Sequence, residues 1–126
     1  MAMYDLIDRL LNFAVDVIFY CRKLDNSIEN KIIKHQLIKL STSSGANYEE
    51  SQGSCTTPDF IYKVKISLKE MRESNYWLRI IKRTVVNVEN PEEIDRLIDE
   101  SDQLRKILGS IIQKKMAQTS DPEHQN

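Results

Sequence analysis

The sequence predicts an all-α protein, an antiparallel up-down-up-down four-helix bundle. Four segments carry apolar residues at steps of three and four, and three short breaks with capping and turn residues separate them. The 126 residues include only 3 Gly and 3 Pro, too little turn chemistry for a sandwich or barrel of many short strands. Short connections make successive helices antiparallel. The helices are predicted at about 4–24, 27–53, 58–86 and 91–117, within one domain spanning 1–118.

The first predicted helix is apolar around much of its circumference. Its main stripe is predicted to be Ile7, Leu10, Leu11, Ala14, Val17, Ile18 and Cys21, whereas Phe13, Val15, Phe19 and Tyr20 lie off it. A simple surface helix needs only one apolar face. We therefore expect this helix either to be centrally buried or to meet a second chain.

The second helix follows a break at Leu24–Ser27, where Asn26 or Ser27 can act as the N-cap. Its middle, Ser41–Asn47, is rich in small residues that local propensity would break. We predict that it stays helical because the apolar spacing continues through Leu37, Leu40, Ser44, Tyr48 and Ser51.

The third and fourth helices each begin at a proline that follows a capping side chain. Thr57–Pro58 starts the third, and Asn90–Pro91 starts the fourth, with Glu93 in its first turn. The third buries Phe60, Val64, Ser67, Met71, Ser74, Leu78, Ile81 and Val85, and the fourth Ile94, Leu97, Ser101, Leu104, Leu108 and Ile111. Residues 119–126 are predicted to be a polar, frayed tail.

Composition restricts the classes of partner. Lys and Arg total 18 and Asp and Glu total 19, so the net charge of −1 argues against an overall basic nucleic-acid binder. No run approaches the 18 apolar residues of a membrane span, and the N-terminus does not read as a signal peptide. Cys21 and Cys55 form no CxxC pair and are predicted to be reduced thiols, so we expect a cytoplasmic protein without membrane partners.

The sequence contains no recognisable catalytic or cofactor motif. Its two histidines, His35 and His124, do not follow a glutamate by three residues, as they would in a di-iron bundle. No HExxH, phosphate-cradling glycine loop or Ser/His/Asp set can be assembled. We predict that the protein is not an enzyme and has no metal or other cofactor.

A polar group is predicted between the second and third helices. Helical spacing brings Ser44, Asn47 and Glu50 toward one side of the second helix and pairs Ser67 with Glu70 on the third. Such residues form either a satisfied polar network that sets how two helices register, or a small-ligand or catalytic site. A catalytic site would need a nucleophile paired with a base, and these residues do not provide such a pair.

A basic stripe follows the third helix opposite its core face. Its members fall within about 40° of one line and span about 27 Å; they are Lys65, Lys69, Arg72, Tyr76, Arg79 and Arg83. The stripe is a solvated face, a track for a phosphate backbone, or a complement to the acidic fourth helix of a neighbouring subunit. That helix carries Glu92, Glu93, Asp95, Asp99, Glu100 and Asp102.

Large apolar residues also lie outside the core face of the third helix. Ile66, Trp77 and Ile80 indicate either a second buried surface, as in a homo-oligomer, or one wide core face within a monomer.

The segment from His35 to Glu50, followed by Asp59–Phe60 and Ser67-Leu68-Lys69-Glu70, resembles the four-helix-bundle family of 23S ribosomal RNA intervening-sequence proteins. The resemblance covers about residues 4 to 116. Its motif positions are Gln36, Leu37, Ser44, Asn47, Glu50, Ser67 and Glu70. Lys39 stands where the family usually has Arg. The lysine keeps the positive charge but lacks the planar guanidinium group.

The resemblance implies a bundle that assembles into a ring, a homopentamer, with a largely uncharacterised molecular function. It also implies a relation to the accessory proteins of diversity-generating retroelements, which bind a reverse transcriptase and nucleic acid. Those relatives are strongly basic, whereas this chain is not. We expect a noncatalytic homo-oligomeric interaction scaffold, or alternatively an accessory protein that binds RNA or a nucleic-acid-processing protein through the basic stripe.

Overall fold

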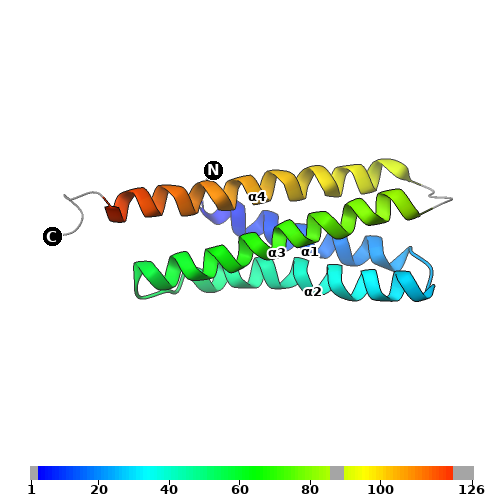
Figure 1. Cartoon of the computed structure of the whole chain (residues 1–126), viewed down its shortest axis with the longest axis horizontal. Coiled ribbons are helices and arrows are strands. Elements are labelled where there is room, and N and C mark those ends of the chain that lie inside the picture. Colours follow the sequence, from blue (N-terminus) through cyan, green and yellow to red (C-terminus); the bar gives the residue numbers. More distant parts are fainter. Residues whose placement is uncertain (1–2, 86–89, 121–126) are drawn as a thin grey trace.

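The computed structural model describes residues 3–85 and 90–120 and confirms the predicted all-α bundle. Its helices are α1 (Met3–Arg22), α2 (Ile28–Ser51), α3 (Thr57–Thr84) and α4 (Pro91–Ser120), and the described part contains no strand. Each helix packs against its neighbours in sequence, and α1 also contacts α4, so the four form a closed square in section. The helices run alternately up and down along one long axis (Figure 1).

Side-chain caps begin α2 and α3. The Ser27 hydroxyl accepts a hydrogen bond from the Asn30 amide at 3.2 Å, which selects Ser27 over Asn26 as the cap of α2. The cap of α3 is Thr56, because its hydroxyl accepts from the Asp59 amide at 3.3 Å, and not the predicted Thr57. Pro58 still lies in the first turn, where its missing amide costs no helical hydrogen bond.

The helices continue through both regions where local propensity was weakest. The small-residue stretch from 41 to 47 is an unbroken part of α2. At its C-terminal end, α4 includes residues 119 and 120, which the sequence predicts to lie in the polar tail. The predicted third-helix end at residue 86 and the remaining tail, 121–126, lie outside the described residues.

The buried face of α1 differs from the predicted stripe. Phe13 and Tyr20 belong to the core, whereas Leu11 is exposed and Ile7 and Ile18 are only half-buried. The physical reason is that the apolar arc of α1 is wide, so periodicity alone does not locate its centre. Packing against α2 and α4 decides which part of the arc is buried. In α4 the same ambiguity explains a second difference: Ile111, which was predicted for the core, is half-buried, whereas Ile112 is buried.

Candidate functional site

Two serines join α2 to α3 at the centre of the polar group predicted from the sequence. Ser44 and Ser67 are both fully buried, with 0% exposure. The Ser44 Oγ donates to the Ser67 carbonyl oxygen at 2.8 Å, and the Ser67 Oγ donates to the Ser44 carbonyl oxygen at 2.7 Å. Small side chains permit this close approach, and the reciprocal bonds set the register of the two helices.

The remaining motif residues lie around this pair but form no single network. The Asn47 Nδ2 donates to the Glu70 Oε1 at 2.8 Å and to the Ser43 carbonyl oxygen at 3.1 Å. Glu50 is exposed, and its Oε1 lies 3.9 Å from the Nζ of Lys63. Gln36 is half-buried, and its side chain forms no hydrogen bond to any described residue. These contacts tie helices together, and none of them pairs a nucleophile with a base.

The basic stripe of α3 is exposed along its whole length. All six of its members are exposed in the chain, and within the part of the chain that the structure describes, none of its five cations forms an ion pair with a carboxylate. The Arg79 guanidinium carbon lies 5.7 Å from the centre of the Tyr76 ring, within cation–π range. The stripe therefore presents positive charge with one aromatic ring beside it.

The acidic residues of α4 are mostly neutralised within their own chain. Ion pairs join Glu93 to Arg96, Asp95 to Lys82, Glu100 to Arg9 and Asp102 to Arg105. The hydrogen bonds from Arg96 are the main reason that the pKa of Glu93 lies below its usual value. This pairing leaves fewer carboxylates on α4 to complement the basic stripe of a neighbouring subunit.

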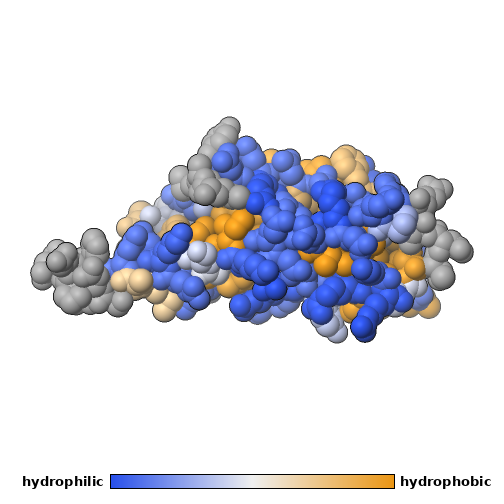
Figure 2. Space-filling model, turned by 90° about the horizontal axis from the view of Figure 1, so that it is seen from above, coloured by the Kyte–Doolittle hydropathy of each residue, from blue (hydrophilic) through white to orange (hydrophobic). Residues whose placement is uncertain are grey.

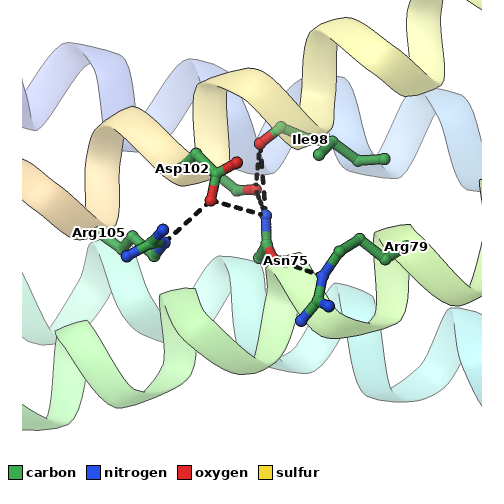
Figure 3. A network of polar contacts seen from close by, with 6 residues as sticks. Asn75, Arg79, Ile98, Asp102 and Arg105 are labelled. Atoms are coloured by element: carbon green, nitrogen blue, oxygen red, sulfur yellow. Dashed lines mark hydrogen bonds and ion pairs between the residues drawn. The ribbon is translucent and has the colours of Figure 1, made fainter.

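A second polar network, between α3 and α4, was not predicted from the sequence (Figure 3). The buried Asn75 donates through Nδ2 to the Ser101 Oγ at 2.8 Å and accepts at Oδ1 from the Arg79 Nε at 2.8 Å. On α4, the Arg105 Nε donates to the Asp102 Oδ1 at 2.9 Å. The sequence hint to this network is Ser101, a polar residue in the otherwise apolar core face of α4. Its partner Asn75 lies 26 residues away on another helix, so helical periodicity cannot identify the pair.

The apolar residues predicted for subunit contacts on α3 are Ile66, Trp77 and Ile80. Trp77 and Ile80 are half-buried and pack against the core of their own chain, and Ile66 is half-buried. Hydrophobic side chains also reach the surface among polar ones on the face seen from above α4 (Figure 2). The large hydrophobic side chains that are exposed among the described residues are Leu11, Val15, Phe19, Ile28, Ile32, Tyr62, Tyr76 and Met116.

The described residues offer little for chemistry or metal binding. No group of three or more His, Cys, Asp and Glu side chains in this part of the chain could hold a metal ion. Burial raises the pKa of the Cys21 thiol to about 11, so it is protonated and unreactive near neutral pH. The helices of the described ranges are all too short or too polar to cross a membrane.

The model of one protein family, described as 23S rRNA-intervening sequence protein, matches residues 4–110. The chain belongs to this family. Membership confirms the family resemblance predicted from the sequence. No curated protein matches the chain.

A solved structure agrees with this assignment. The chain is similar to a crystal structure of a protein of unknown function from the S23 ribosomal protein family of Bacteroides thetaiotaomicron, with 33% identity and a TM-score of 0.75. The similarity covers 85% of this chain and 97% of that one. The intervening-sequence family is thus one whose fold is established while its molecular function is not.

Proposed function

We propose that the protein is a noncatalytic scaffold that assembles with copies of itself through the outward face of α1. The observation that carries this proposal is a row of apolar side chains, Leu11, Val15 and Phe19, which are 60%, 39% and 53% exposed. They are four residues apart, so they follow one line along the helix. We call them the α1 row.

The described residues leave the α1 row exposed, although the Arg22 guanidinium carbon lies 5.3 Å from the centre of the Phe19 ring. The sequence left two explanations for the wide apolar arc of α1, central burial or a second chain, and among the described helices α1 packs only against α2 and α4. Contiguous exposed apolar surface is typical of an interaction site. A second copy is the occupant we propose because the family resemblance implies a ring of identical subunits, a pentamer. The free thiols Cys21 and Cys55 are in keeping with assembly in the cytoplasm.

A single charge placed in the α1 row tests the proposal. Leu11→Glu would bury an unpaired carboxylate in the interface, whereas Asn12→Glu places the same group on the next exposed position of α1. By sedimentation velocity we expect the wild-type chain and Asn12→Glu to sediment as an assembly, and Leu11→Glu to sediment near the chain mass of 14.7 kDa. Equal behaviour of the two variants would contradict a role for the α1 row.

A second function, binding of RNA, is favoured by the unpaired cations of the basic stripe. A phosphate backbone would supply the counter-charge that the described carboxylates do not. Binding of a structured RNA should weaken steeply between 50 and 200 mM salt. Lys65→Glu combined with Arg83→Glu should abolish it, whereas the same reversal at Lys31 and Lys39, exposed on α2, should not. Absence of binding at low salt would reject this function.

A further inference from the structure

Three arginines surround an open pocket between α3 and α4. The pocket has a volume of about 490 Å³ and is lined by Arg72, Asn75, Arg79, Asp102 and Arg105. Arg72 and Arg79 also belong to the basic stripe, but Arg105 comes from α4. The pocket is therefore more than a section of the stripe, because two helices supply its cations.

Two of the guanidinium groups are held in place by side-chain hydrogen bonds. The Arg79 Nε donates to the Asn75 Oδ1 at 2.8 Å, and the Asn75 side chain is fixed in turn by its bond to the Ser101 Oγ at 2.8 Å. Asn75 is only 6% exposed, so this support is part of the helix interface. Such a support orients Arg79 before a ligand arrives and lowers the entropic cost of binding.

Arg105 is held in the same way from the other helix. Its Nε donates to the Asp102 Oδ1 at 2.9 Å, and Asp102 also accepts weakly from the Asn75 Nδ2 at 3.4 Å. Both arginines thus use Nε for support and keep their terminal nitrogens outside the network (Figure 3). Terminal guanidinium nitrogens are the donors that form paired hydrogen bonds with phosphate oxygens.

The charge of the pocket is suited to a dianion. Three arginines and one aspartate give +3 − 1 = +2 among the lining residues, and no described carboxylate pairs with Arg72 or Arg79. A phosphate monoester carries close to two negative charges near neutral pH, whereas a backbone phosphodiester carries one.

We propose that this arginine pocket binds the dianionic phosphate of a phosphate monoester, supplied either by a free nucleotide or by the 5′-phosphorylated end of an RNA. Arg79 and Arg105 provide the oriented donors, and Arg72 adds charge at the rim. The proposal does not rest on assembly through the α1 row, because the pocket is complete within one chain.

Calorimetric titration with inorganic phosphate and with adenosine 5′-monophosphate tests the site. Losing one charge-assisted contact should weaken binding about tenfold, so Arg79→Gln and Arg105→Gln should each have that effect. Arg79→Lys should weaken phosphate binding similarly, because lysine keeps the positive charge but lacks the planar guanidinium that Asn75 holds in place. Lys31→Gln, which removes an exposed charge on α2 outside both the pocket and the basic stripe, is the matched control and should change affinity less than about twofold.

The source of the phosphate is tested with two otherwise identical RNA oligomers, one 5′-phosphorylated and one ending in a 5′-hydroxyl. A preference for the first that disappears in Arg105→Gln assigns the pocket to RNA ends, and binding of the mononucleotide without such a preference assigns it to free nucleotides. The proposal is overturned if neither small phosphate binds and the two RNAs bind equally. It is also overturned if Lys31→Gln weakens phosphate binding as much as the pocket variants. If RNA binding depends on the basic stripe but not on Arg105, the second candidate function is supported and the pocket proposal is overturned.

Discussion

Replacing Ser44 and Ser67 by alanine, singly and together, tests how the two hydroxyl groups join α2 to α3. Each hydroxyl has one hydrogen, and the distances of 2.8 and 2.7 Å direct each hydrogen to the opposite carbonyl oxygen. In this crossed arrangement the two Oγ atoms, 3.1 Å apart, face each other as acceptors, although by distance either could donate to the other. Each alanine removes one hydrogen bond and leaves the other intact.

The expected magnitude follows from this arrangement. One net hydrogen bond is worth about 1 kcal/mol, and the carbonyl left behind still accepts its helical bond. Each single variant should therefore lower the free energy of unfolding by about 1 kcal/mol, and the double variant by about 2 kcal/mol. In a double-mutant cycle the coupling energy should be below about 0.5 kcal/mol.

Urea denaturation followed by circular dichroism at 222 nm measures all four proteins. If one hydroxyl instead donates to the other, either single variant loses the shared bond, and the double variant costs about as much as one single. A coupling energy near 1 kcal/mol would therefore refute the crossed arrangement. Ser67→Val is the steric control: it adds volume where the helices approach closely and should cost about 1–3 kcal/mol through overpacking.

Three further predictions follow from particular contacts. Gly45→Ala should raise the melting temperature, because the new Cβ would lie 3.4 Å from the Leu10 Cβ, at the short limit of ordinary contact, and alanine is favoured over glycine in a helix by about 0.5–1 kcal/mol. One thiol per folded chain should react with Ellman's reagent, since Cys55 is exposed whereas Cys21 is 1% exposed with a pKa of about 11. On acidification from pH 6 to pH 3, Glu93→Gln should lose less stability than the wild type.

The sign of the last effect is set by the direction of the pKa shift. The folded-state pKa of Glu93 is lower than its ordinary value of 4.5, so its contribution to stability is fully present above pH 4.5 and is lost as the pH falls through the folded value. Equal losses in the two proteins would contradict this. A lower melting temperature for Gly45→Ala would show that α1 cannot yield at Leu10, and prompt reaction of both thiols would show that Cys21 is accessible.

The fold could be predicted because each helix carries its own apolar spacing and its own start signal. Pro91 marks the beginning of α4, and the continuity of α2 follows from spacing that its small residues do not interrupt. The errors occur where two neighbouring residues satisfy the same rule. Thr56 and Thr57 both carry a hydroxyl, and only the helix geometry decides which one reaches the Asp59 amide.

The site could be predicted only in part. Helical spacing placed Ser44 and Ser67 on facing sides of α2 and α3, and the stripe of α3 is exposed because it lies opposite a well-defined core face. The network around Asn75 could not be anticipated, because its partners come from α4 and pairing between distant helices depends on their relative shift along the bundle axis. The exposure of Leu11 has a similar origin, since neighbouring helices select which part of a wide apolar arc is covered.

The mass of the wild-type chain in solution, measured by multi-angle light scattering at a low and a high concentration, tests the central claim most directly. Assembly through the α1 row predicts a mass that is a multiple of 14.7 kDa, with five copies as the number that the family resemblance implies. A mass of 14.7 kDa at both concentrations would contradict the claim, because Leu11, Val15 and Phe19 would then remain exposed in the native protein.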